Sequence, residues 1–323
     1  MRRCGADGGT PGPSEPGPEL DERARAVDLI TLSHDELGVI VDGLADPLQP
    51  VVAVAFSSTC KGLRTPLGAA LEVLRQRHEK ASALCRKIST WDRVQLQRFP
   101  VWNCAVLRRL DTFRLNPDDM EFTDDAIDHV ATLGMLLSSG SLPRLQELVL
   151  RGLVCRDAGI QAFCEGLGSG AAPLLHTLYV NHNRFGPAGA DAFAAALRRG
   201  AMPKLEKLYL GGNPIGNRGV AALAVPLRAG CIKELYLPDC NIDDEGMASL
   251  FANLNKEDFK VLDSLFMSSN ALTDKGCAMM VSAIDSDRMP SLETIRLSMN
   301  ECVSDAARDA IKEAIVRRKI RRA

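Results

Sequence analysis

The stretch that decides the fold runs Leu205-Glu-Lys-Leu-Tyr-Leu-Gly-Gly-Asn213. Counted from Leu205 as position one, it has leucine at positions one, four and six and asparagine at position nine. Copies of the pattern start at residues 110, 145, 175, 205, 232, 262 and 292, so the steps are 27 to 30 residues after a first step of 35. A period of this size is the signature of a solenoid, in which stacked units share one core. We therefore expect about seven repeats.

Each copy predicts a short strand followed by a helix. Leucines at positions four and six point to one side of a strand, because alternate side chains share a face. Position nine, where the strand ends, should turn inward and pair with backbone groups of the loops. Its residues are Asn183, Asn213, Asn270 and Asn300, with Cys240 in the fifth copy.

A glycine follows fourteen residues after five of the starts, at Gly159, Gly189, Gly219, Gly246 and Gly276. Two residues earlier stand mostly helix-capping types, namely Asp157, Pro187, Asn217, Asp244 and Asp274. This spacing predicts a glycine in the first turn of a helix, where a small residue lets stacked helices approach. The capping residue should satisfy that helix's unpaired amides.

One helix per repeat at a period near 30 resembles the ribonuclease-inhibitor-like class of leucine-rich repeats. The resemblance implies an α/β horseshoe with a parallel sheet on the concave side and α-helices on the convex side. We expect this solenoid to occupy residues 99–316, behind a small all-helical head over 27–98. Residues 1–26 are rich in glycine, proline and charge without periodicity, which predicts a disordered tail.

The head carries a second resemblance. The segments Leu32-Ser-His-Asp-Glu-Leu37 and Phe56-Ser-Ser-Thr-Cys-Lys-Gly-Leu-Arg64 flank an Asp46-Pro47 break and resemble an F-box. Ser33 stands where that family has proline, and Leu63 where it often has tryptophan. The resemblance implies that a Skp-family adaptor of a cullin ubiquitin ligase binds the head through Leu37, Ile40, Leu44 and Phe56. The alternative is that these helices only cap the first repeat, whose apolar face needs a cover.

Composition restricts the partners. The net charge is -2 and the sequence pI about 6.2, so no overall basic bias points to nucleic acid. We find no signal peptide and no apolar run that could span a bilayer. The ten cysteines are scattered without a C-x-x-C pair, which favours reduced thiols. We expect a cytoplasmic protein, with the nucleus as the alternative.

The fifth position of each repeat should point out of the concave face. Its residues are Arg114, Val149, Tyr179, Tyr209, Tyr236, Phe266 and Arg296. The column holds all three tyrosines of the chain, and rings on adjacent strands should stack. Aromatic and arginine side chains are typical of protein-binding hot spots, so we predict a protein target there, bound by Arg114, Tyr179, Tyr209, Tyr236, Phe266 and Arg296. The alternative is that the rings only stabilise the sheet.

We predict no enzyme activity, no metal site and no cofactor. P-loop, H-E-x-x-H and nucleophile-elbow motifs are lacking, and the five histidines show no ligand spacing. Repeats of this class include activators of the Ran GTPase, which use a loop arginine and end in an acidic tail. Arg184 stands where that arginine could be, but residues 317–323 are basic. This basic tail either favours a helix C-terminus or serves nuclear import or an acidic partner.

Two functions remain. The first is a substrate-recognition adaptor of a Skp-cullin-F-box type ubiquitin ligase, with the target on the concave face. The second is a scaffold or inhibitor unrelated to ubiquitylation, in which the head is only a cap.

Overall fold

The computed structural model describes residues 45–58, 67–95, 104–115, 125–251 and 253–322. Of the predicted adaptor-binding residues, Leu37, Ile40 and Leu44 lie outside these ranges, as does the predicted tail at 1–26. Phe56 falls in a described helix, but its side chain is outside the description.

The strands of the described chain form one parallel sheet in sequence order, β1 to β7. Each strand occupies positions three to five of a repeat, and equal positions of neighbouring repeats pair, as Leu178 does with Leu208. The predicted solenoid is confirmed. The strands are β1 (Thr112–Arg114), β2 (Glu147–Val149), β3 (Thr177–Tyr179), β4 (Lys207–Tyr209), β5 (Glu234–Tyr236), β6 (Ser264–Phe266) and β7 (Thr294–Arg296).

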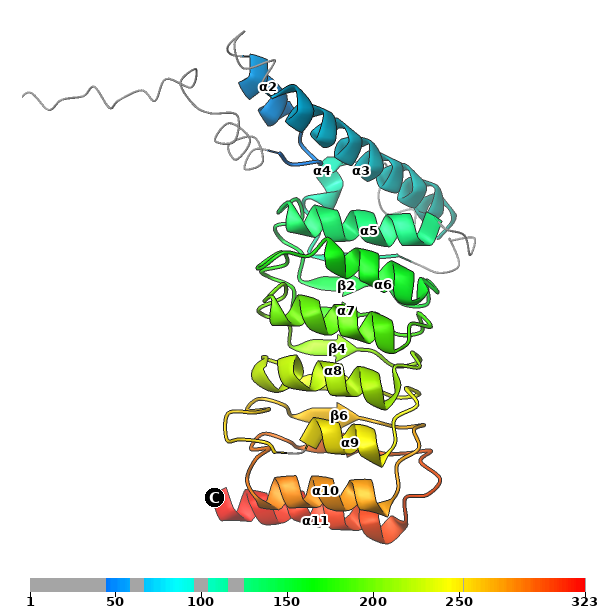
Figure 1. Ribbon diagram of the computed structural model, residues 1–323, viewed down its shortest axis with the longest axis vertical. Coiled ribbons are helices and arrows are strands. Elements are labelled where there is room, and N and C mark those ends of the chain that lie inside the picture. The colour runs from blue at the N-terminus through cyan, green and yellow to red at the C-terminus, as the bar shows by residue number, and fades with distance from the viewer. Residues whose placement is uncertain (1–44, 59–66, 96–103, 116–124, 252, 323) are drawn as a thin grey trace, which may run out of the picture.

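One α-helix follows each strand, and these helices stack into a second layer along one face of the sheet (Figure 1). From the N-terminal end the helices are α2 (Val51–Ser58), α3 (Gly68–Gln95), α4 (Cys104–Leu107), α5 (Asp125–Ser138), α6 (Arg156–Glu165), α7 (Pro187–Arg198), α8 (Gly216–Ala229), α9 (Asp244–Phe251), α10 (Asp274–Asp285) and α11 (Asp305–Arg322). None of these described helices is both long enough and apolar enough to cross a membrane.

The core lies between the two layers. The central residue of each strand from β1 to β6 is at most 1% exposed, as Leu208 and Leu235 illustrate. Burial of a leucine side chain stabilises the folded state by about 1.5–3 kcal/mol. The other face of the sheet points away from the helices, and we call it the sheet face.

The asparagine at position nine hydrogen-bonds to backbone groups of the loops, as predicted. Asn213 is fully buried, its amide nitrogen donates to the carbonyl oxygens of Leu210 and Val180 at 2.6 and 2.9 Å, and its oxygen accepts from the Asn183 amide at 2.8 Å. The Cys240 thiol lies 3.7 Å from the equivalent Leu210 oxygen. Asn213 thus connects the ends of the neighbouring strands β3 and β4.

The predicted helix caps act on a different helix from the one expected. Asp157 lies in the first turn of α6, but its Oδ1 accepts from the backbone amides of Gly186 and Gly189, both at 2.8 Å, at the start of α7. Asp244 does the same for Thr273 and Gly276 at the start of α10. The prediction was wrong because the stacking of the repeats places each of these two carboxylates at the start of the helix in the next repeat.

The helical head is continuous with the repeat core. Ala81, Leu84 and Cys85 of α3 are buried in the same apolar cluster as Leu107 and Leu133. Helix α3 therefore covers the apolar face of the first repeat. Helix α2 differs, because its three valines Val51, Val52 and Val54 are 71, 44 and 51% exposed.

At the other end, α11 packs against α10, and most of its cations have partners there. Arg317 and Arg321 pair with Asp285 at 2.9 and 3.4 Å, and Arg322 pairs with Asp287 at 2.9 Å. Arg318 is 2% exposed and donates to the carbonyl groups of Met289 and Leu292. The basic residues therefore hold the last helix on the last repeats.

Candidate functional site

The structure brings four of the predicted target-binding residues together on the sheet face. Tyr179, Tyr209, Tyr236 and Phe266 stack in sequence, with ring centroids 4.1, 4.0 and 4.0 Å apart and interplanar angles of 17, 17 and 5°. We call these four residues the aromatic ladder. Each ring is half-buried. Because the rings stack face to face along the solenoid, they present edges and hydroxyl groups, rather than ring faces, to anything that binds.

The two predicted arginines lie at unequal distances from the ladder. Arg296 of β7 is in register with Phe266 and is exposed, so it directly extends the column. Arg114 of β1 is also exposed, but it is in register with Val149, which separates it from Tyr179. Arg184, the residue considered for GTPase activation, is exposed with a φ of 57° in the loop after β3.

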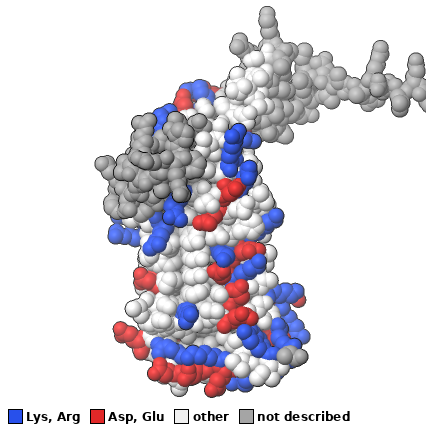
Figure 2. Space-filling model, turned by 180° about the vertical axis from the view of Figure 1, so that it is seen from behind, with Lys and Arg blue, Asp and Glu red and all other residues white. Residues whose placement is uncertain are grey.

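One side of the ladder is charged and the other is not. Lys207 pairs with Glu234 at 2.6 Å, and Lys233 pairs with Glu206 at 2.8 Å. Figure 2 shows this side of the molecule, where a column of acidic and basic side chains borders a mostly uncharged strip. On the uncharged side stand small residues such as Gly211, Pro238 and Ser268. A binding partner therefore meets apolar ring edges bordered by ion pairs on one side only.

A chain of hydroxyl groups runs along the ladder, which sequence reasoning did not anticipate. The hydroxyl groups of Tyr179 and Tyr236 each neighbour that of Tyr209, and the Tyr236 hydroxyl donates to the Glu234 carboxylate at 3.1 Å. Burial and the neighbouring Tyr209 hydroxyl group raise the pKa of Tyr179 to about 12. Burial and the neighbouring Tyr236 hydroxyl group likewise raise the pKa of Tyr209 to about 12. The hydroxyl groups thus remain protonated donors and acceptors at neutral pH.

These pKa shifts give a prediction for alkaline pH. A phenol in an unfolded chain titrates near 10, about two pH units below Tyr179 and Tyr209. Their contribution to stability should be complete below about pH 10 and should fall as the pH rises towards 12. All three tyrosines are in the ladder, so tyrosinate absorbance reports on it alone. We expect a native midpoint well above the midpoint in urea. Equal midpoints, with far-UV circular dichroism showing a folded chain, would contradict the raised pKa values of the ladder tyrosines.

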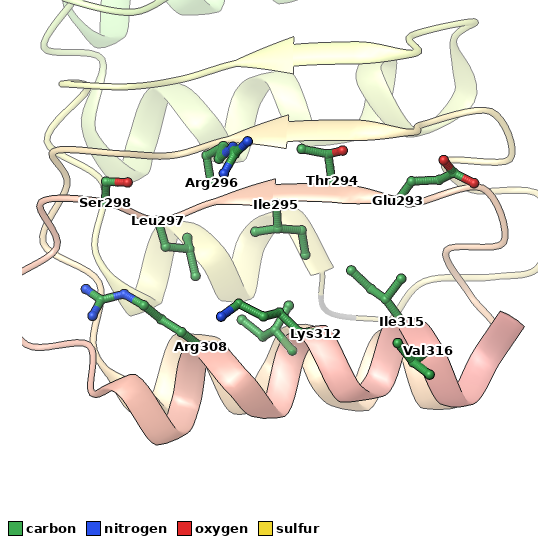
Figure 3. Close-up of a pocket in the computed structure, with 11 residues that line it drawn as sticks. Glu293, Thr294, Ile295, Arg296, Leu297, Ser298, Arg308, Lys312, Ile315 and Val316 are labelled. Atoms are coloured by element: carbon green, nitrogen blue, oxygen red, sulfur yellow. The ribbon is translucent and has the colours of Figure 1, made fainter.

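A pocket of about 470 Å³ lies between β7 and α11 (Figure 3). Ile295 of β7 and Leu297, directly after this strand, line one side of the pocket, and Ile315 and Lys312 of α11 line the other. Ile295 is partly exposed here, whereas the equivalent Leu265 is fully buried between neighbouring strands. Arg296 also lines this pocket, so it borders both the pocket and the ladder.

Among the described residues, no group of three or more His, Cys, Asp or Glu side chains is placed to hold a metal ion. The groups with shifted pKa values in the ladder are its three phenols.

The repeats match a known family. The sequence model described as "Leucine Rich repeat" matches residues 171–194, 201–224 and 231–251, three consecutive units that contain β3, β4 and β5. These units are leucine-rich repeats. Proteins built from them use extended surfaces of the solenoid for binding. A search of curated proteins finds no match.

Among the solved structures that are similar to this chain, two have low sequence identity. The first, titled "Leiomodin-1 Actin-Binding Site 2 (ABS2)", is 15% identical over 41% of this chain and 73% of its own, with a TM-score of 0.35. The second, the Rad7 and Elc1 complex in yeast, is 15% identical over 61% of this chain and 46% of that chain, with a TM-score of 0.40. Neither likeness bears on the function of this chain.

Proposed function

We propose that this protein is a non-catalytic protein-binding module whose target docks on the aromatic ladder. The observation that carries the proposal is the ladder itself, since four half-buried rings from four successive strands form one continuous ridge. Tyrosine is enriched in the centres of protein interfaces, because it offers a large apolar area together with a hydroxyl group. The bordering ion pairs form a polar rim on one side.

The competing explanation is that the ladder only stabilises the sheet. Each stacked pair contributes about 0.5–1.5 kcal/mol without any partner. Stability and binding are separable, however, because β4 and β5 keep their buried leucines when the rings are removed.

The test uses the double variant Tyr209→Ala and Tyr236→Ala. The target is first identified by covalent cross-linking to the wild-type ladder, and its affinity is then measured by calorimetry. We expect the double variant to bind at least about 30-fold more weakly, since a hot-spot residue contributes about 2 kcal/mol or more. The control is Val225→Ala, which removes an exposed apolar side chain from α8 in the helical layer. Equal affinity of the folded double variant would refute the proposal.

We propose further that the head makes this module the substrate-recognition adaptor of a Skp-cullin-F-box type ubiquitin ligase. The F-box resemblance of the sequence supports this role. Three exposed valines on α2, within the F-box-like segment, also support it, because they offer an apolar surface to an adaptor. The burial of α3 against the repeats supports the alternative, a scaffold or inhibitor whose head is a cap. The two roles can coexist in different helices of the head.

A pull-down with purified Skp adaptor distinguishes these functions. We expect the wild type to bind and Leu44→Asp to lose binding, because a carboxylate would enter the apolar contact that the F-box resemblance implies. Failure of the wild type to bind would reject the ligase role and leave the ladder proposal untouched.

We also propose that the repeats belong to the ribonuclease-inhibitor-like subtype, since a single α-helix follows each strand. For the location of the protein we propose the cytoplasm.

A further inference from the structure

Two cysteines meet where the head joins the solenoid. Cys85 of α3 and Cys104 of α4 have their sulfur atoms 3.9 Å apart. Cys85 is 3% exposed, while Cys104 is half-buried and reachable from solvent. A disulfide has a sulfur–sulfur distance of about 2 Å, so a closing movement of about 2 Å would join them.

A hydrogen-bonded path leads away from Cys104. Its sulfur lies 3.9 Å from the Ser82 hydroxyl, which lies 3.4 Å from Nε2 of His78. Nδ1 of His78 lies 2.6 Å from the Pro47 carbonyl oxygen. A carbonyl oxygen only accepts, so Nδ1 of His78 carries a proton and donates to it. The Ser82 hydroxyl can also donate to the Cys104 thiolate, which favours the deprotonated form of this thiol.

The two thiols differ in acidity. The hydrogen bond from Cys85 lowers the pKa of Cys104 to about 6, whereas that bond and burial raise the pKa of Cys85. By contrast, burial is the main cause that raises the pKa of Cys155 and of Cys164 to about 12. A thiolate is the reactive form of cysteine. Cys104 therefore combines access and reactivity, and Cys85 stands next to it in the protonated form.

We propose that Cys104 and Cys85 form a peroxide-oxidisable pair, in which Cys104 is the reacting thiol and Cys85 resolves it to a disulfide between α3 and α4. In the first step the Cys104 thiolate attacks one oxygen of hydrogen peroxide, the O–O bond breaks, and Cys104 sulfenic acid and hydroxide form. In the second step the Cys85 sulfur attacks the sulfenic sulfur, the S–OH bond breaks, and the thiol proton leaves with hydroxide as water. Two thiols are oxidised by two electrons, and one peroxide is reduced to two waters.

The disulfide would fasten the cap helix to the first repeat. Helix α3 already contributes Ala81 and Leu84 to the repeat core, and the new bond would connect it covalently to α4 at the same level. A cross-link of this kind restricts the unfolded chain, so the oxidised protein should melt at a higher temperature than the reduced protein. This regulation does not depend on the ladder or on an adaptor.

The test uses the full chain in a Cys4→Ser and Cys60→Ser background, since these two cysteines lie outside the described residues. The reduced protein is exposed to hydrogen peroxide, blocked with iodoacetamide and digested without reduction for mass spectrometry. We expect a cross-linked peptide containing Cys85 and Cys104, lighter by about 2 Da than the sum of the two thiol peptides, the mass of two hydrogens. Reduction with dithiothreitol should remove it and reverse the thermal shift.

Variants assign the two roles. In Cys85→Ser, the Cys104 sulfenic acid should persist and be trapped by dimedone. In Cys104→Ser, Cys85 should remain unoxidised at the same peroxide dose. Cys231 and Cys302 are exposed and serve as internal references for simple accessibility. Oxidation of these two references before the pair, or a wild-type pair that stays fully alkylated with iodoacetamide, would overturn the proposal even if a variant failed to fold.

Discussion

Replacing Asn213 with alanine should lower the free energy of unfolding by about 2–4 kcal/mol, because three buried hydrogen bonds disappear at once. The Asn183 amide would lose its acceptor, and the carbonyl oxygens of Leu210 and Val180 would each lose a donor. Asn213 is fully buried, so water does not replace these partners without opening the core. Urea unfolding followed by circular dichroism measures the loss.

The chain supplies its own matched control for this prediction. Cys240 occupies the same position in the next repeat, with its sulfur 3.4 Å from the Pro238 carbonyl oxygen. Asn213→Cys should therefore be milder than Asn213→Ala, although the two remove the same amide. Conversely, Cys240→Asn should stabilise the protein by about 1 kcal/mol, since it restores stronger hydrogen bonds. Equal losses for the alanine and cysteine variants at position 213 would mean that packing, rather than hydrogen bonding, sets the cost.

The fold could be predicted from the sequence because each repeat signals itself locally. Leucines at positions four and six identify the buried side of a strand, and all seven strands fall at positions three to five of their repeats. The same alternation placed Tyr209 on the opposite face, and the register of β4 with β5 then made the stacking of Tyr209 on Tyr236 a geometric consequence.

The contacts that escaped prediction join residues without a local signal. Cys85 and Cys104 are 19 positions apart and belong to no motif. Asp157 caps a helix that begins 30 residues later, and a local pattern assigns it instead to the helix that contains it. The domain boundary at 98–99 remains a prediction, while the apolar core itself extends from the repeats into α3. Such contacts depend on how the units stack, which follows only once the whole solenoid is built.

The stacking of the repeats also predicts a large effect of substitution at Gly276. A methyl group there would lie within 3.0 Å of Oδ1 of Asp244, and the φ of Gly276 is one that alanine adopts readily. That oxygen accepts from the amides of Thr273 and Gly276, both at 3.0 Å, so the methyl group would displace the cap of α10. We expect Gly276→Ala to lower the free energy of unfolding by about 2–3 kcal/mol, the sum of a lost cap and local overpacking. Gly68→Ala is the control, because nothing lies within 4 Å of its added carbon.

A double-mutant cycle shows whether the clash with Asp244 causes this loss. Asp244→Ala alone should cost about 1–2 kcal/mol, since it removes the same cap without a clash. Combined with Gly276→Ala, it vacates the space that the methyl group needs, so the double variant should be more stable than the sum of the single losses by about 1 kcal/mol or more. Urea unfolding of the four proteins gives this coupling. Strict additivity of the two single losses would contradict a clash between the methyl group and Asp244. The glycine would then be required for a reason other than the carboxylate of the preceding repeat.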